Sequence, residues 1–212
     1  VLKVARAMGA PTPADLYGSL AAIWQPSQVP TANGHAHHHP LGQPEREWFE
    51  PFAEWMMVED ALTYLPDDIL AKVDRAGMAV SLELRVPFLA PQVAEFAWSL
   101  PLDLKVRNGV GKHVVRQLLY KHVPQALIDR PKTGFGIPVA SWLRGDVRPW
   151  AESLLSRDAL ASSGLLRPDP IRALWSSHLD QEIDGEHQLW AVLMFQQWFQ
   201  ELPERVRAAQ AG

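Results

Sequence analysis

Hydrophobic residues recur at helical spacing along most of the chain. Intervals of three and four residues place apolar side chains on one face of a helix. The pattern is clear in four groups: Leu16, Leu20, Ile23 and Trp24; Trp48, Phe52, Trp55, Met56 and Leu62; Ile171, Leu174, Trp175 and His178; and Leu189, Val192, Leu193, Phe195, Gln196 and Phe199. Convincing period-two alternation is absent. We therefore predict an almost wholly helical structure.

A helix is predicted over about residues 66–81. Pro66 suits the first turn, where its missing N–H costs nothing, and Asp67 and Asp68 suit the positive end of the helix dipole. Prolines then divide the middle of the chain into turns and short helices. Residues 26–45 have no apolar periodicity and are rich in proline, so we expect a flexible loop there. We expect residues 1–212 to form part of one domain, with site-bearing residues at 64–145 and C-terminal helices at 146–212.

Composition narrows the possible functions. The 212 residues are 47% hydrophobic, which is enough for a core. A net charge of -4 gives no general attraction to nucleic acid or anionic membranes, and no run of about 18 apolar residues predicts a membrane span. The absence of cysteine excludes disulfides, thiolate metal ligands and cysteine nucleophiles, and it fits a cytoplasmic location. The chain begins inside an amphipathic segment without Met, so we expect a piece of a longer protein.

Charged residues concentrate in and after the helix predicted at 66–81. The charged residues within 66–81 are interpreted most simply as a solvated helix face with ordinary ion pairs, such as Asp68 with Lys72. Glu83 and Arg85 differ, because they lie among apolar residues, where an unpaired charge is costly. A buried ion pair between Glu83 and Arg85 is therefore expected.

Two glycine-rich segments and a histidine cluster are candidate ligand sites. Lys132, Gly134 and Gly136 could direct an ammonium and backbone amides at phosphate, although a structural turn between prolines is the simpler interpretation of that segment alone. Lys112 and Arg116, after Gly109 and Gly111, are typical of an exposed helix start and are interpreted as structural. The imidazoles at 35 and 37–39 lack an orienting acid, so no metal site is predicted there.

Several segments together resemble glutamine-dependent asparagine synthetase. They are Tyr64 to Ala79, Glu83 to Leu89, Gly111-Lys112 with Arg116, Arg130 to Gly136, Trp142 to Gly145, and Leu189-Trp190. The resemblance implies an N-terminal glutaminase domain in the same polypeptide and a C-terminal synthetase domain of the α/β adenine-nucleotide-binding, PP-loop ATP pyrophosphatase type. The family's Ser-Gly-Gly-x-Asp-Ser and Ser-Gly-x-Gly-x-Asp-Glu elements do not occur here. The chain therefore resembles the helical C-terminal portion of that domain, and a mostly all-α piece is expected.

The resemblance also implies residue roles. Lys132 would contact the phosphates as pyrophosphate leaves, and Arg75 would face the same site. Acidic and basic positions around aspartate and the nucleotide would be Asp67, Asp74, Glu83 and Arg85, with Gly134 and Gly136 forming the bend beside Lys132. ATP and Mg²⁺ would be required, and a homodimer is possible. Ala90 departs from the family, where aspartate is usual, which predicts a weaker helix cap.

The expected function is part of an ATP-dependent amidotransferase that converts aspartate to asparagine through β-aspartyl-AMP, using ammonia derived from glutamine. This portion alone is expected to be inactive, because half a nucleotide site cannot position the triphosphate. Two alternatives stay open. One is a related amidotransferase or β-lactam-synthetase-like enzyme that activates another carboxylate. The other is a helical interaction module without catalysis.

Overall fold

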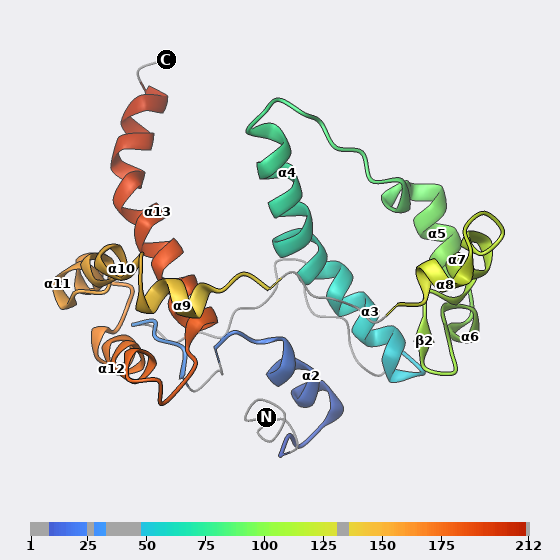
Figure 1. The fold of residues 1–212 in the computed structure, drawn as a ribbon, viewed down its shortest axis with the longest axis horizontal. Helices are drawn as coiled ribbons and strands as arrows, with labels where there is room; N and C mark the ends of the chain where they lie inside the picture. Colours follow the sequence, from blue (N-terminus) through green and yellow to red (C-terminus); the bar gives the residue numbers. More distant parts are fainter. Residues whose placement is uncertain (1–8, 25–27, 33–47, 131–135, 211–212) are drawn as a thin grey trace. The chain divides into compact units, whose positions relative to one another are not determined.

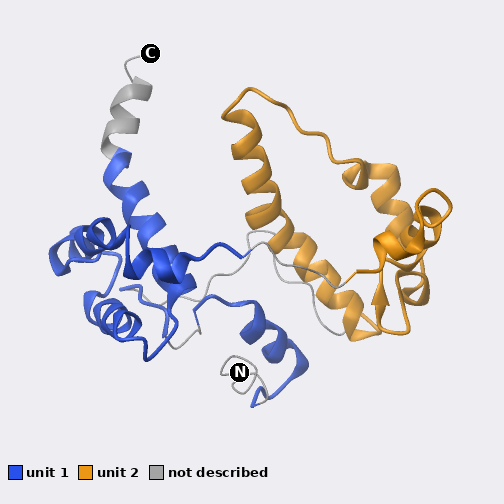
Figure 2. Cartoon of the chain, viewed as in Figure 1, with its two compact units in different colours: residues 1–37, 135–212 blue, residues 38–134 orange. Residues whose placement is uncertain are grey.

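The chain is mostly helical, as predicted. The computed structural model describes residues 9–24, 28–32, 48–130 and 136–210, the last eight of these by their backbone alone. Contacts divide the chain into two units, residues 1–37 with 135–212 and residues 38–134 (Figures 1 and 2). Strand structure in the described residues is limited to one two-stranded hairpin and one isolated bridge. No described helix is both long enough and apolar enough to cross a membrane.

In its described residues, unit 1 combines an N-terminal helix with five C-terminal helices. Their bounds are α2 (Pro13–Ala21), α9 (Val139–Arg144), α10 (Arg148–Leu154), α11 (Arg157–Ser162), α12 (Pro168–Leu179) and α13 (Glu186–Gln210). The last four cover most of the predicted C-terminal segment, and the helical groups expected at 171–178 and 189–199 fall in α12 and α13. The sequence pattern therefore predicted this part correctly.

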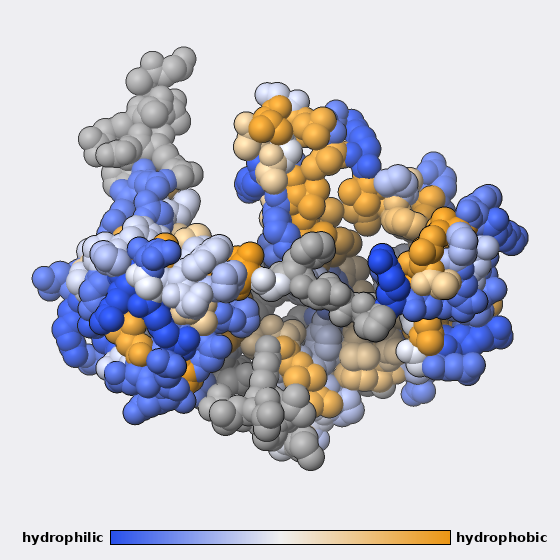
Figure 3. All heavy atoms as spheres, in the orientation of Figure 1, coloured by the Kyte–Doolittle hydropathy of each residue, from blue (hydrophilic) through white to orange (hydrophobic). Residues whose placement is uncertain are grey.

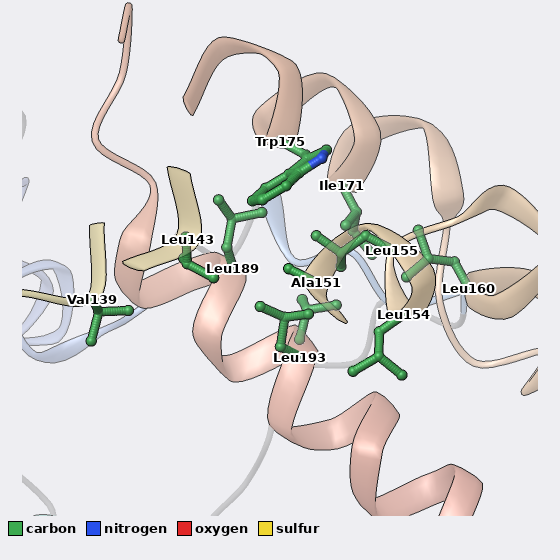
Figure 4. Packing of buried hydrophobic residues seen from close by; sticks show 11 residues of the cluster. Val139, Leu143, Ala151, Leu154, Leu155, Leu160, Ile171, Trp175, Leu189 and Leu193 are labelled. Carbon is green, nitrogen blue, oxygen red and sulfur yellow. The ribbon is translucent and has the colours of Figure 1, made fainter. Parts of the chain in front are cut away.

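The core of unit 1 lies where α9 to α13 meet. Figure 4 shows Trp175 and Ile171 of α12 pointing toward Leu155, Ala151 and Leu189 from neighbouring elements. Leu143, Leu160 and Leu193 are also fully buried in this cluster. Gln196 is buried as well, and its Nε2 donates to the carbonyls of Leu154 at 3.2 Å and Ala159 at 2.9 Å. These bonds tie α13 to α11 and to the end of α10, so apolar packing and a buried amide together fix the bundle.

An N-terminal segment, residues 28–32, is bonded to the loop before α12. The Arg167 N–H donates to Pro30 O at 2.7 Å, and the Ala32 N–H donates to Leu165 O at 2.7 Å. The Arg167 guanidinium adds a bond to Val29 O at 2.7 Å. Unit 1 is therefore built from two parts of the chain that are far apart in sequence.

Unit 2 consists of short elements. They are α3 (Phe52–Leu62), the π-helix η3 (Leu65–Leu70), α4 (Ala71–Met78), the 3-10 helix η4 (Pro87–Leu89), α5 (Pro91–Ser99), α6 (Leu102–Lys105), β1 (Val106–Arg107), β2 (Val110–Gly111), α7 (His113–Leu119) and α8 (Gln125–Ile128). The proline-divided middle of the chain thus forms the turns and short helices that were predicted. The hairpin was not predicted.

The predicted helix start near Pro66 is confirmed to within one residue, because η3 begins at Leu65 with Pro66 in its first turn. Thr63 leaves helical geometry at φ -121° and ψ -75°, and the chain then re-enters the helical region as a π-helix. The Ala71 N–H donates to Pro66 O, five residues earlier. Pro66 has no N–H to bond with Leu62, and its ring would collide with that carbonyl in a regular α-helix. The break at Thr63 avoids that collision, and η3 then starts with the proline in its first turn.

The predicted helix end at residue 81 is too late, by three residues. Helix α4 ends at Met78, and Ser81 adopts a left-handed conformation with φ 56°. The Leu82 N–H donates to Gly77 O at 2.9 Å, and the Ser81 N–H donates to Met78 O at 3.0 Å. This pair of bonds is a Schellman motif, which usually places glycine at the left-handed position. Because serine occupies it here, the sequence carried no glycine stop signal.

The hairpin of β1 and β2 has a turn signal that the sequence analysis passed over. Val106 pairs with Gly111 and Arg107 with Val110. The two turn residues, Asn108 and Gly109, have φ 52° and 74°, as a type I′ turn requires. Asn-Gly is the preferred dipeptide for that turn. Strands of two residues are too short to show any period-two pattern, so only the turn could have predicted them.

Unit 2 leaves most of its apolar side chains exposed. Its buried residues, within the described part of the chain, are Trp55, Glu59 and Gly77. Figure 3 shows hydrophobic side chains gathered over α4 and the segment that follows it. Val80 is 74% exposed and Phe88 is 64% exposed. Unit 2 therefore offers far more uncovered apolar surface than the packed bundle of unit 1.

Candidate functional site

The candidate site lies in unit 2, where the chain turns back after α4. Residues 82–84 lie close against α4, and this contact depends on Gly77, the one buried residue of that helix. A Cβ at Gly77 would lie 2.7 Å from Leu82 O and 2.8 Å from Leu84 Cδ1. Such distances are shorter than real Cβ contacts, so only glycine lets the returning segment lie this close to the helix. The Schellman motif and Gly77 together hold the returning segment against α4.

A hollow of about 550 Å³ lies between the helix and the returning segment. Its size falls in the range of small-molecule sites, roughly 300–1,000 Å³. The lining residues come from η3 and α4, from the returning segment, and from η4 and the start of α5: Leu70, Val73, Asp74, Leu84, Arg85, Val86, Pro87, Leu89, Ala90 and Pro91. Apart from one carboxylate and one guanidinium, the side chains that line it are apolar. Two predicted site residues, Asp74 and Arg85, thus line the same hollow from different segments.

Each of these two charged residues has an oppositely charged neighbour. The Arg75 guanidinium donates to Asp74 Oδ2 at 3.4 Å, and Arg85 lies 2.5 Å from Glu83 Oε1. All four side chains are at least 64% exposed. Solvent-exposed pairs of this kind are weak, worth about 0–1 kcal/mol. A ligand with its own carboxylate and ammonium could therefore exchange with them.

The expectation of a buried Glu83–Arg85 pair is wrong. The ion pair forms, but the side chains of Glu83 and Arg85 are 70% and 85% exposed. Their apolar neighbours Leu82 and Phe88 are themselves 57% and 64% exposed, so the segment offers no low-dielectric surroundings. Apolar residues beside a charge in sequence do not bury it unless another element covers them.

Asp67 lies apart from the hollow. It is exposed on the π-helix η3, and it does not line the cavity. Its neighbour Asp68 forms the expected pair with Lys72, with Oδ1 and Nζ 3.5 Å apart. The ordinary i,i+4 interpretation is thus confirmed for Asp68 and Lys72. Asp67 lies on the same helical stretch but is not one of the residues that line the cavity.

Of the three predicted site residues Lys132, Gly134 and Gly136, the structure describes only Gly136. Lys132 and Gly134 lie outside the described residues, and so do the four histidines at 35 and 37–39. Gly136 is exposed and belongs to unit 1, and a Cβ there would meet nothing within 4 Å. Its glycine identity is not required by local crowding.

Within the described ranges, no three His, Cys, Asp or Glu side chains lie close enough together to hold a metal ion. Carboxylates are the protein ligands that Mg²⁺ prefers, usually one or two of them together with substrate phosphates. Asp74 alone lines the hollow. The described residues therefore do not form a metal centre by themselves.

Arg116 has the structural role that its position predicted. Its Nε donates to Gly111 O at 3.1 Å, and its Nη1 pairs with Asp129 Oδ1. Asp129 is a residue that the sequence analysis did not single out. No motif marks it, because its three side-chain partners lie 4, 9 and 13 residues earlier in the chain.

Comparison with known proteins identifies the family. The model of the asparagine synthase family matches residues 3–200. Asparagine synthetase 1 of Bacillus subtilis is 33% identical over 143 residues, covering 68% of this chain and 22% of that protein. A putative asparagine synthetase of Mycobacterium tuberculosis is 34% identical over 155 residues, covering 73% and 23%. The human asparagine synthetase is 32% identical over 111 residues, covering 51% and 18%. No solved structure gave a significant match.

A mostly helical chain with this match is a portion of a ligase-type domain, and it belongs to the asparagine synthase family. The chain spans less than a quarter of the length of the relatives just named. Family membership supports a role in an amidotransferase of the ligase class.

Proposed function

We propose that this chain is the helical C-terminal portion of the synthetase domain of a glutamine-hydrolysing asparagine synthetase. In the complete protein, an N-terminal glutaminase domain would release ammonia, and the synthetase domain would activate aspartate with ATP. The family match and the relatives named above as asparagine synthetases support this assignment.

The hollow beside α4 carries the proposal. It sets one carboxylate, Asp74, and one guanidinium, Arg85, in an otherwise apolar wall of about 550 Å³. An amino acid has the complementary charges, because its ammonium suits Asp74 and its carboxylate suits the forked donors of Arg85. We assign aspartate to this hollow, with its β-carboxylate directed outward to the nucleotide.

The reaction follows in two displacements. An oxygen of the aspartate β-carboxylate attacks the α-phosphorus of ATP, the bond from that phosphorus to the bridging oxygen of pyrophosphate breaks, and β-aspartyl-AMP forms. Ammonia then attacks the β-carbonyl carbon, the bond to AMP breaks, and the nitrogen loses a proton to give the amide. Asparagine, AMP and pyrophosphate are the products.

The remaining predicted residues would stabilise the charge that develops in the first displacement, or orient the residues that line the hollow. An ammonium at Lys132, with amides near Gly134 and Gly136, would stabilise the negative charge that develops on pyrophosphate. Arg75, beside Asp74 on α4, would orient that carboxylate and add positive charge, while Glu83 would orient Arg85. Mg²⁺ would neutralise phosphate charge when bound with ATP, held by residues beyond those that line the hollow.

The direct test is release of pyrophosphate by the full-length protein that contains this chain. With ATP, Mg²⁺ and ammonia, we expect pyrophosphate release that depends on aspartate, with AMP formed in equal amount. Release that depends on another carboxylate, and not on aspartate, would reassign the protein to a related amidotransferase. No release with any carboxylate would favour a non-catalytic helical module.

The assignment of the hollow has its own test. Arg85→Leu and Asp74→Asn should each raise the KM for aspartate at least about tenfold, since each removes a charged hydrogen bond of roughly 1.5–3 kcal/mol. Asp169→Asn is the matched control, because Asp169 forms an exposed ion pair with Arg157 in unit 1. A KM for aspartate that changes equally in all three variants would place aspartate elsewhere.

A further inference from the structure

Several backbone groups directly after α4 have no hydrogen-bond partner in the described part of the chain. Residues 82–86 form no helix, turn or bridge, and Val86 has extended geometry with φ -95° and ψ 107°. The Leu82 N–H is bonded to Gly77 O, but no backbone hydrogen bond joins residues 83–85 to another described residue. Extended backbone with unpaired N–H and C=O groups is a template for pairing with another strand.

The side chains of residues 82–86 alternate in polarity. Leu82, Leu84 and Val86 are apolar, whereas the residues between them, Glu83 and Arg85, are charged. Successive side chains of extended backbone lie on opposite faces, so the apolar ones share one face and the charged ones share the other. The three apolar residues are 57%, 45% and 41% exposed. One face of the segment is therefore apolar and incompletely covered, as in a strand that lacks a neighbour.

Hydrogen bonds fix both ends of this segment. At its start the Leu82 N–H donates to Gly77 O at 2.9 Å, and at its end the Leu89 N–H donates to Val86 O at 3.0 Å. Gly77 also lets Leu84 lie against α4, since a Cβ on the glycine would be 2.8 Å from Leu84 Cδ1. A segment that is already held in extended form loses little conformational entropy when a second strand binds it.

Exposed apolar residues continue beyond both ends of the segment. Val80 is 74% exposed and Phe88 is 64% exposed, and Figure 3 shows hydrophobic side chains gathered over this part of unit 2. A contiguous apolar surface of this kind marks an interaction site. When a strand is added to exposed backbone, the main-chain bonds supply affinity and the adjoining side chains supply specificity. Residues 80–88 therefore have the features of a surface that accepts a strand.

The shortness of the segment favours a strand from the same polypeptide. Five extended residues span roughly 17 Å, too short to bury the ~800 Å² per partner of a standard interface between two molecules. A strand of the same polypeptide needs no such area, because its effective concentration is already high. The relatives named above are matched over 22%, 23% and 18% of their lengths, so most of such a protein lies outside this chain. That part is the source of the strand that these observations favour.

We propose that residues 82–86 pair with a β-strand from the part of the polypeptide outside residues 1–212. Apolar side chains of that strand lie beside Leu82, Leu84 and Val86. The pairing holds the backbone of Arg85, and with it one wall of the hollow beside α4. The inference rests on the proposed function only in taking this chain as one portion of a longer asparagine synthetase.

Hydrogen exchange of single amides in the unmodified full-length protein tests the pairing. The N–H groups of alternate residues in a strand point to the same edge, so one added strand protects every second amide. We expect the amides of residues 83 and 85, or else those of 84 and 86, to exchange at least about a hundredfold more slowly than the other two. The Leu82 amide is the internal reference, because its bond to Gly77 O slows its exchange with or without the added strand.

Photo-crosslinking of the full-length protein identifies the source of the strand. Phe88 is replaced by the photoreactive amino acid p-benzoylphenylalanine, and irradiation links it to the peptide that lies beside it. We expect crosslinked peptides from outside residues 1–212 of the same polypeptide. Ile183 is the control position, because it is also an exposed apolar residue, at 51%, and it lies between α12 and α13 in unit 1. The same replacement at Ile183 should not capture the peptides that position 88 captures.

Any one of three results would overturn the inference. The first is uniform exchange at residues 83–86, whether fast or slow, because pairing with a single strand protects alternate amides. The second is a crosslink from position 88 only to residues 1–212, only to a second copy of the protein, or to nothing. The third is capture of the same peptides from positions 88 and 183.

Neither measurement depends on catalytic activity. Wild-type protein that releases no pyrophosphate would refute the proposed function while leaving both readouts intact, so the two failures are distinguishable. The exchange measurement uses unmodified protein, so it decides the pairing even if the photoreactive variant does not fold.

Discussion

Gly77 and Leu84 lie closer together than any residue with a side chain at position 77 would permit. A Cβ on Gly77 would be 2.8 Å from Leu84 Cδ1, and it would be 2.7 Å from the Leu82 carbonyl oxygen. A flexible leucine tip can move away, but a backbone carbonyl cannot do so without shifting the returning segment. That segment carries Arg85, so the contact at Gly77 also sets one wall of the candidate site.

Gly77→Ala should therefore destabilise unit 2 by about 1–3 kcal/mol, the usual cost of overpacking. Gly18→Ala is the matched control, because Gly18 lies inside α2 and a Cβ there would meet nothing within 4 Å. Alanine should raise helix stability at Gly18 by about 0.5–1 kcal/mol. Urea unfolding of both variants followed by circular dichroism would measure the two effects, and a neutral Gly77→Ala would contradict the close approach.

Ser81→Gly should stabilise the end of α4. Ser81 holds φ at 56°, a left-handed conformation that costs a non-glycine residue roughly 1–2 kcal/mol. Glycine relieves that cost but loses more entropy on folding, so the net gain should be about 0.5–1 kcal/mol. Ser81→Ala should give no gain, since alanine has the same conformational penalty. A lower unfolding midpoint for Ser81→Gly than for Ser81→Ala would argue against the Schellman geometry.

Ala90→Asp should strengthen the start of α5. Ala90 is the N-cap residue, with φ -59° and ψ 132°, and it makes no side-chain bond to the first turn. A carboxylate or amide oxygen at that position accepts an otherwise unpaired N–H, a gain of about 0.5–2 kcal/mol. Ala90→Asn should give a similar gain without the charge, which separates capping from electrostatics. Thermal unfolding of both variants is the measurement, and destabilisation by both would mean that capping is sterically blocked.

The stability of unit 1 should depend on His178. Burial is the main cause that lowers the pKa of His178 below 6.5, and Arg144 adds to it, although Asp184 and Glu186 act in the opposite direction. The unfolded chain then takes up this proton at a higher pH than the folded chain. The contribution of His178 to stability is complete above about pH 6.5 and is lost as the pH falls toward the lowered value.

Denaturant unfolding at a series of pH values measures this dependence. His178→Asn should flatten the curve below pH 6.5, because Asn cannot gain a charge but its side-chain oxygen can still accept the Gly185 N–H that now bonds Nδ1 at 3.3 Å. Acidic residues titrate in both proteins, so the difference between the two curves isolates the histidine. Curves that stay parallel through this range would refute the assignment.

The sequence was most informative where apolar spacing continued over many residues. The helices α12 and α13 follow directly from their repeated apolar positions. The start of the site helix near Pro66 was predictable, because the proline lies in the first turn of η3, but no sequence signal indicated that this turn is a π-helix. The end of the site helix was misplaced because Ser81 takes a position that usually requires glycine.

The candidate site was predictable in its charged residues but not in its shape. Asp74 and Arg85 were identified from the charge pattern and the family resemblance, and both line the hollow. Their apolar neighbours in the wall, such as Val73 and Pro87, carry no distinguishing signal, because apolar residues are common everywhere in the chain. The exposure of Glu83 depends on which other elements cover residues 82–89, and the neighbouring residues in the sequence do not specify this.

The bonds between residues 28–32 and Arg167 have a consequence for synthesis. A ribosome makes residues 38–134 before it reaches Leu165, so all of unit 2 is synthesised before the partner of Pro30 and Ala32 exists. More than a hundred residues are synthesised after residues 28–32 before their hydrogen-bond partners at Leu165 and Arg167 are present. Unit 1 is thus the last part of this chain to be completed during translation, although its first residues are made before those of unit 2.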